Sequence, residues 1–243
     1  MFEQYTHRSI PRSVRPWIMV QRWHDLLFAH WELPAKQIRP LVPPQLDLDL
    51  HQGSAYVAVA PFHMSGIRAR LLPAFPGVSR FPELNVRTYV HYRGVPGVYF
   101  FSLDAGSLPA VWGARIGYGL PYFHADMSVK INGAEIEYCS RRIQNPQPAN
   151  FRGRYQPISP PRQSERGSLE YFLTERYCLY TVRGGEVFRA HIDHSPWPLQ
   201  EATAEIECNT MARAAGIELP EGKPLLHFSH FLEVRIWWPE RAG

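Results

Sequence analysis

Lysine is scarce in this sequence. Of its 26 lysine and arginine residues, only Lys36, Lys130 and Lys223 are lysines. Amine chemistry, such as Schiff-base formation with a carbonyl substrate, therefore has three side chains on which to act. Lys130 falls on an expected strand near the middle of the chain, and we interpret it as a solvated side chain.

Cysteine is equally scarce. Cys139, Cys178 and Cys208 are odd in number, widely spaced and without a CxxC pair. This pattern argues against a thiol-ligated zinc site or a dithiol redox motif. It is typical of a protein in the reducing cytoplasm.

The histidines offer no better metal site. His191 and Asp193 would share one face of a strand, while His194 would point to the other face. No third ligand follows at the spacing of a zinc or iron motif. We therefore expect neither a metal nor another cofactor.

Long apolar runs and dense positive charge are also missing. No apolar run approaches the ~20 residues of a membrane helix, and the first residues lack the apolar core of a signal peptide. The net charge is +4, and the basic residues are scattered, which does not favour a nucleic-acid partner. We therefore expect neither a membrane nor a nucleic acid as a partner.

The sequence does contain many short β-prone segments. With 23 prolines and few apolar patterns of helical length, it favours short strands and many turns. No repeat or linker interrupts it, so we expect a single mainly β domain over 1–243, with 1–16 as an N-terminal arm. The expected strands cover 26–31, 46–50, 55–60, 85–92, 98–103, 125–131, 134–141, 152–155, 177–183, 186–191, 203–207 and 226–238. A hairpin joins 46–50 to 55–60, a loop covers 65–80, and short helices cover 35–39, 108–118, 168–173 and 209–215. The helix over 108–118 is expected to be capped by Ser107 and to end at Gly119, and the helix that begins at Ser168 is also expected to be capped.

The stretch 81–125 organises the chain. Its residues alternate from 85 to 92, so that Asn85 and Arg87 share one polar face of a half-buried strand. Turn residues at 93–97 and a second β-prone run at 98–103 predict an antiparallel hairpin. In a closed barrel, such a polar face either meets solvent or lines a cavity.

Three segments resemble the acetoacetate decarboxylase superfamily. They are PAKQIRPLVPPQL at 34–46, PELNVRTYVHY at 82–92 and GLPYF at 119–123. Over nearly the whole chain, with FPELNVRTYV, FLTERYCLY and PWPLQ as its clearest segments, the sequence more closely resembles the uncharacterised bacterial YqjF-like family. The resemblance implies a mainly β (α+β) fold: a closed, complex, mostly antiparallel acetoacetate-decarboxylase-like barrel with a few short outer helices and a cavity inside.

The superfamily's reaction does not follow from the fold. Its decarboxylases use a lysine in a Pro-Lys-Lys corner as the Schiff-base nucleophile, and the matching corner here reads Pro-Tyr-Phe at 121–123. Glu83 resembles an acidic pocket residue and Arg22 a pocket arginine, whereas a second acidic position falls near Val57. If this protein is an enzyme, the resemblance implies that it is not a Schiff-base decarboxylase.

The candidate ligand-binding residues are mostly on the central strand. Glu83, Asn85 and Arg87 lie two apart, so a carboxylate, an amide and a guanidinium would point one way and could grip a small acid or keto group. The alternatives are an internal ion pair that fixes the barrel, or a solvated face. Arg22 and Arg176 are further ligand-binding candidates. For Arg176, at the expected cavity mouth, the alternative is an exposed ion pair.

The candidate catalytic residues are Glu83, Tyr122 and His124. Tyr122 and His124 lie at the corner where the superfamily keeps its nucleophile, and a phenol and an imidazole are suited to general acid–base chemistry. Packing is the alternative role for both side chains.

Two functions remain open from the sequence. The first is a cytoplasmic protein that holds a small organic ligand, a carboxylate or keto compound, in the barrel cavity, and either only binds it or acts on it without a lysine. The second is a non-catalytic interaction or assembly module with a filled barrel. A homo-oligomer fits both. A cavity lined by Glu83, Arg87 and Tyr122 would favour the first function, and a barrel packed with apolar side chains the second.

Overall fold

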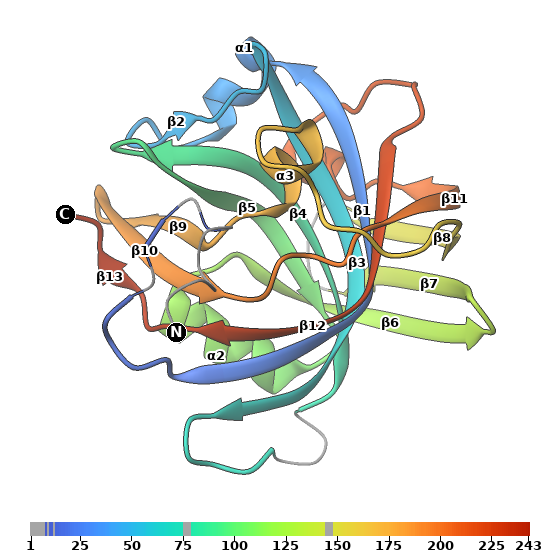
Figure 1. Cartoon of the computed structure of the whole chain (residues 1–243), viewed down its shortest axis with the longest axis horizontal. Helices are drawn as coiled ribbons and strands as arrows, with labels where there is room; N and C mark the ends of the chain where they lie inside the picture. The colour runs from blue at the N-terminus through green and yellow to red at the C-terminus, as the bar shows by residue number, and fades with distance from the viewer. Residues whose placement is uncertain (1–7, 9, 12, 75–78, 144–147) are drawn as a thin grey trace.

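Most of the chain lies in strands (Figure 1). The structure is a computed structural model and describes residues 8, 10, 11, 13–74, 79–143 and 148–243. Its strands are β1 (Met19–Pro34), β2 (Asp47–Leu48), β3 (Ser54–Ala69), β4 (Phe81–Tyr92), β5 (Val95–Ala105), β6 (Tyr122–Asn132), β7 (Glu135–Arg142), β8 (Asn150–Pro157), β9 (Cys178–Arg183), β10 (Glu186–Asp193), β11 (Gln200–Asn209), β12 (Leu225–Ile236) and β13 (Glu240–Arg241). Its helices are α1 (Ala35–Ile38), α2 (Leu108–Tyr118) and α3 (Leu169–Thr174), with 3-10 turns η1 (Arg39–Leu41) and η2 (Arg213–Ala215).

Thirteen strands of the described residues form one sheet. Their order is β13-β10-β9-β5-β6-β7-β8-β11-β12-β1-β3-β4-β2, and the further pairings β4–β5 and β10–β12 close the sheet on itself. The sheet is mostly antiparallel, with β5 running parallel to β6 and to β9. This closed, complex, mostly antiparallel architecture confirms the predicted fold class.

The two closures make two rings that share β1, β3, β4, β5 and β12. The packed ring adds β6, β7, β8 and β11, and the cavity ring adds β9 and β10. Because side chains alternate along a strand, each shared strand sends one set of side chains into each ring. β4 is therefore buried on both faces over most of its length, and the prediction of a half-buried strand was wrong.

Aromatic side chains fill the packed ring. Tyr138 and Tyr155 are fully buried, and each phenol finds a backbone acceptor, as buried tyrosines require. The Tyr138 hydroxyl donates to the carbonyl oxygens of Phe62 (3.0 Å) and Glu83 (2.7 Å), and the Tyr155 hydroxyl donates to that of Asp25 (2.9 Å). This ring is a closed core whose two fully buried tyrosine hydroxyls are both satisfied.

The central hairpin forms through a two-residue turn. Arg93 and Gly94 both have positive φ, 51° and 75°, which is the type I′ turn that matches the twist of antiparallel strands. The turn is therefore shorter than the predicted 93–97, and β5 begins at Val95. The register shifts between Val86 and Arg87, where β5 carries an extra residue opposite β4.

A break in alternation lets β1 face the cavity on both sides of Asp25. Asp25 has a φ of 49°, a left-handed conformation that aspartate tolerates better than most residues. The buried Asp25 carboxylate is held by His230 Nδ1 at 2.7 Å. Trp23 before the break and Leu26 after it both line the cavity, although they are three positions apart, an odd spacing that would put them on opposite faces of a regular strand.

Two of the helices, α2 and α3, agree closely with the expectation. α2 covers 108–118 as predicted and ends at Gly119 in the left-handed conformation, with a φ of 62°. The Ser107 side chain makes no capping hydrogen bond, contrary to the prediction. α3 is capped as predicted, because Ser168 Oγ accepts from the Tyr171 backbone N–H at 3.2 Å.

Three local predictions were wrong. β2 pairs with β4 rather than with β3, so 46–50 and 55–60 do not form a hairpin. β3 continues to residue 69, into the predicted loop, because it pairs with β1 as far as Ala69. The predicted helix at 209–215 is only the 3-10 turn η2. Much of the predicted arm lies outside the described residues, as do 75–78 of the predicted loop.

Candidate functional site

A cavity of about 470 Å³ lies inside the cavity ring, between β1, β3, β4, β5, β9, β10, β12 and α2. Most of its wall is apolar. The polar side chains on the wall come from a small group of residues: Gln21, Trp23, Glu83, Asn85, Arg87, Tyr118 and Tyr122. Such a wall, apolar with a few convergent polar groups, is typical of a small-molecule site.

Three of these residues come from the polar face of β4. Glu83, Asn85 and Arg87 retain 3, 4 and 8% of their exposure, and all three line the cavity. The alternation that groups them in sequence thus places them on one wall, and that wall faces the cavity rather than bulk solvent.

Glu83 is a neutral acid at pH 7. Burial raises the pKa of its carboxyl from 4.5 to about 8; the hydrogen bond from Tyr122 lowers this pKa, and the nearby Asp104 raises it. The Tyr122 hydroxyl donates to Glu83 Oε2 at 2.8 Å. Burial and Glu83 in turn raise the pKa of Tyr122. The site therefore presents a protonated carboxyl and a neutral phenol side by side.

Arg87 is a buried cation without a carboxylate partner. Its guanidinium lies 5.3 Å from the centre of the Phe28 ring, and its Nε has no hydrogen-bond partner in the described part of the chain. The internal pair with Glu83 that the sequence left open does not form, because Glu83 bonds to Tyr122 instead. Asn85 is comparable, since its Oδ1 is buried without a partner among the described residues.

A polar network supports Arg87 from behind. The neighbouring Tyr89 is fully buried; its hydroxyl donates to the Leu173 carbonyl oxygen at 2.8 Å and lies 2.7 Å from His30 Nε2. Burial lowers the pKa of His30 well below its ordinary value, and the charge of Arg87 lowers it further. Tyr89 and His30 thus form a neutral, fixed pair of side chains behind Arg87.

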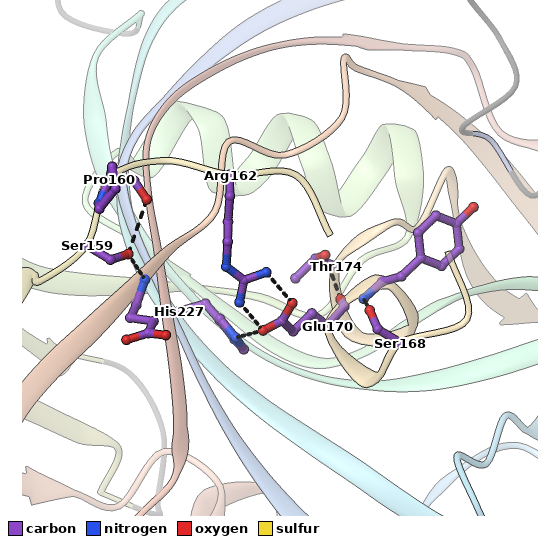
Figure 2. Close-up of polar contacts among 9 residues, drawn as sticks. Ser159, Pro160, Arg162, Ser168, Glu170, Thr174 and His227 are labelled. Carbon is purple, nitrogen blue, oxygen red and sulfur yellow. Dashed lines mark hydrogen bonds and ion pairs between the residues drawn. The ribbon is translucent and has the colours of Figure 1, made fainter. Parts of the chain in front are cut away.

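α3 holds that network in place (Figure 2). Glu170 on α3 accepts two hydrogen bonds from the Arg162 guanidinium and lies 3.3 Å from His227 Nε2. The Thr174 hydroxyl donates to the Glu170 carbonyl oxygen at 2.8 Å. These contacts fix a short helix that would be unstable alone, and so fix the Leu173 carbonyl that receives the Tyr89 hydroxyl.

The other predicted site residues lie away from the cavity wall. Arg22 is exposed and pairs with Glu233 at 3.4 Å, because it alternates with the wall residues of β1. His124 is half-buried on β6 and is not part of the wall. Arg176 is buried, pairs with Asp49 and lies over two aromatic rings. It is thus a paired structural arginine rather than the exposed ion pair considered from the sequence.

Sequence reasoning missed three polar wall residues, Gln21, Trp23 and Tyr118, and most of the apolar wall. Tyr118 is the last residue of α2; it lines the cavity, and its buried hydroxyl has no partner among the described residues. A helical tyrosine before a capping glycine gives no sign of this role. The three lysines are all exposed, and none lines this cavity. Among the described residues, no group of three or more His, Cys, Asp or Glu could hold a metal ion.

The fold is that of the acetoacetate-decarboxylase-like proteins. The structure is similar to acetoacetate decarboxylase from Legionella pneumophila, with a TM-score of 0.66 at 11% identity over 99% of this chain and 94% of that one. It is also similar to the enduracididine biosynthesis enzyme MppR complexed with pyruvate, with a TM-score of 0.64 at 10% identity over 94% and 91% of the two chains. At such low identities, these likenesses show the fold alone.

The sequence comparisons narrow the class to a family. The model of the DUF2071 family, described as an uncharacterized conserved protein, matches residues 20–233. The chain is 48% identical over 241 residues to Uncharacterized protein YqjF from Bacillus subtilis (strain 168), which covers 99% of each sequence. The chain therefore belongs to the DUF2071 family, and the resemblance to YqjF is confirmed. Among the helices of the described residues, none has the length and apolar character needed to cross a membrane.

Proposed function

We propose that the cavity binds a small organic carboxylate and that Arg87 is its anchor. The observation that carries the proposal is the buried Arg87 guanidinium, which has no carboxylate partner within the described residues. An isolated buried charge is costly, whereas a carboxylate ligand would supply the charge-assisted hydrogen bonds that arginine is suited to form. The pyruvate complex of the structurally similar MppR supports a carboxylate of this kind.

Glu83 and Tyr122 give the site a proton donor and acceptor. A carboxyl whose pKa is about 8 is protonated at neutral pH yet able to release its proton. Glu83 would hydrogen-bond to a carbonyl or hydroxyl of the ligand, and Asn85 would bind a second polar atom beside Arg87. The arrangement supports binding together with lysine-independent acid–base chemistry on a keto or hydroxy group.

The experiment compares a carboxylate with its amide. Calorimetry should show that butanoate binds the purified protein and that butanamide binds at least tenfold more weakly. Arg87→Met should abolish butanoate binding, while the control Arg141→Met, which changes an exposed arginine on β7, should not. Equal binding of the acid and the amide, or full binding by Arg87→Met, would show that Arg87 is not a carboxylate anchor.

A second experiment tests the absence of Schiff-base chemistry. Borohydride added with acetoacetate should leave the mass of the protein unchanged, because the lysines at 36, 130 and 223 are exposed and lie away from the cavity. A stoichiometric adduct on any of them would restore a lysine mechanism.

A second candidate function, assembly with another copy of the chain, is supported by one observation. Leu108, Trp112 and Ile116 form a stripe along α2, and 42, 56 and 78% of their areas are exposed. Apolar stripes of this kind often mark interfaces. Light scattering should then show an oligomer that Trp112→Glu dissociates; a wild-type monomer would exclude this function.

A further inference from the structure

The cavity is larger and more apolar than a short acid requires. Its volume is about 470 Å³, roughly that of 15 molecules of liquid water at ~30 Å³ each. A three-carbon keto acid would occupy only a small part of it and leave apolar wall exposed to water. Cavities of this size and lining ordinarily hold ligands of drug-like size.

We propose that the ligand is an amphipathic monocarboxylate, with a hydrocarbon tail that runs from Arg87 towards Trp238. This inference rests on the proposed function, which supplies the carboxylate anchor, and it adds the chemical class and direction of the rest of the ligand.

The direction follows from strand register. Arg87 lies opposite Ala58 on β3, and Glu83 lies opposite Phe62. Beyond Phe62, the wall continues along β3 to Ala69, a further ~20 Å at about 3.3 Å per residue. The polar residues of β4 therefore lie toward one end of the cavity wall, and an apolar channel leads away from them.

The far end of the channel is mostly apolar, with Gln21 and Tyr118 as its polar side chains, and it includes an exposed tryptophan. Met19 on β1 pairs with Ile236 on β12 and with Ala69 on β3, so the three strands come together there. Trp238 lines the cavity, and 60% of its area is exposed. An alkyl or aryl tail would replace water along this wall, which is the main source of affinity for apolar groups.

α2 forms the wall of the channel with small side chains. Ala110, Gly113 and Ala114 all line the cavity, and a Cβ placed on Gly113 would meet no atom within 4 Å. Larger side chains at these positions would fill the channel. Because these lining residues are small, the cavity side of α2 leaves room for a ligand tail.

The charges of the wall limit the ligand to one carboxylate. Arg87 is the sole cationic side chain on the described wall. The one carboxyl among the described wall residues, Glu83, is neutral. A second carboxylate or a phosphate on the tail would be buried against apolar groups without a counter-ion, which is strongly unfavourable. A single acidic head with an uncharged tail fits both ends of the site.

A homologous series of straight-chain carboxylates from acetate to dodecanoate tests the tail, with calorimetry below the micelle concentration. Affinity should rise about fourfold per methylene until the channel is full. The alcohol of the longest tight-binding acid should bind at least tenfold more weakly. Affinity that does not change with chain length would overturn the inference while leaving the carboxylate anchor intact.

Blocking the channel is the second arm. Gly113→Phe should weaken binding of the long acids at least thirtyfold and leave butanoate unchanged, and Ala110→Leu should act in the same direction. The matched control is Gly222→Phe, at an exposed glycine where a Cβ would also meet no atom within 4 Å. It should change neither the affinity for the long acids nor the affinity for butanoate. Long acids that bind both folded channel variants as tightly as the wild type would place the tail elsewhere. Failure of the anchor itself would give a different result: Arg87→Met would then bind acids of every chain length as tightly as the wild type.

Discussion

Buried charged side chains lie on both sides of the β4–β5 hairpin, and the two sides are built in opposite ways. On the side of the packed ring, Asp104 accepts two hydrogen bonds of 2.7 Å from Arg142 of β7, and both side chains are almost completely buried. On the side of the cavity ring, Glu83 and Arg87 are equally buried but do not pair. Since Asp104 lies opposite Leu84, the neighbour of Glu83, the two sets are separated by little more than the thickness of the sheet.

The difference distinguishes a structural ion pair from a binding site. Burying a charge is tolerated in a stable core when a well-oriented partner compensates it, as Arg142 does for Asp104. Where the partner is missing, the protein either loses stability or gains the missing group from a ligand. Mutations on the two sides should therefore have different consequences: loss of folding on one and loss of binding on the other.

The largest effect is expected from Arg142→Ala. It leaves the Asp104 carboxylate buried and uncompensated, which should lower the free energy of unfolding by about 3–5 kcal/mol. Urea denaturation measures this loss, and Asp104→Ala in the same chain should recover part of it. A loss below about 1 kcal/mol would mean that the pair contributes no more than a surface pair.

The next effect concerns Glu83 and pH. Because the folded-state pKa of about 8 lies above the ordinary 4.5, the folded protein retains a proton that the unfolded chain releases. This stabilisation is complete below about pH 4.5 and is lost as the pH rises towards 8, by about 1.4 kcal/mol per pH unit within that window.

Glu83→Gln isolates the contribution of Glu83 to the pH dependence of stability, because glutamine does not titrate. The difference in unfolding free energy between wild type and variant should shift in favour of the variant as the pH rises from 5 to 8. Carboxylate binding to the wild type should also weaken above pH 8, where Glu83 ionises. Binding to Glu83→Gln should not weaken in that range. Parallel pH profiles for the two proteins would contradict a buried, neutral Glu83.

A smaller effect on stability is expected from Arg87→Met. Had Arg87 been paired with Glu83, the loss would have been about 3–5 kcal/mol. Without that pair, the change removes an uncompensated charge and a contact with the Phe28 ring, so stability should change by no more than about 1 kcal/mol. Binding of carboxylates should be lost entirely. A large destabilisation would show that Arg87 has a structural role like that of Arg142.

The smallest effect is expected from Arg141→Ala, the residue next to Arg142. Arg141 pairs with Asp126 at 3.0 Å, but 73 and 65% of the two side chains are exposed. Solvent screening leaves such a pair worth less than about 0.5 kcal/mol. The two adjacent arginines on β7 therefore form a matched test of burial, and similar denaturation midpoints for both variants would contradict the comparison.

Much of the site could be predicted from local patterns. The period-two alternation grouped Glu83, Asn85 and Arg87 on one face because strand geometry fixes that relation. The helix at 108–118 followed from its capping glycine. Arg22 and His124 could not be placed correctly, because the direction in which a strand faces depends on its partners. Tyr118 was missed because no local pattern distinguishes a cavity-lining tyrosine from a packed one.

By itself, the sequence determined the strand-rich fold class, the lysine-free corner at 121–123 and the polar face of β4, since these depend on residue identity and on spacing along one segment. Only the tertiary structure decided that β4 is buried on both faces and that α2 and Trp238 complete the cavity. It also decided that Asp104 pairs with Arg142, whereas Arg87 has no carboxylate partner among the described residues. Those outcomes depend on pairings such as β5–β9 and β10–β12. Each joins segments far apart in the chain, whose contact no local pattern encodes.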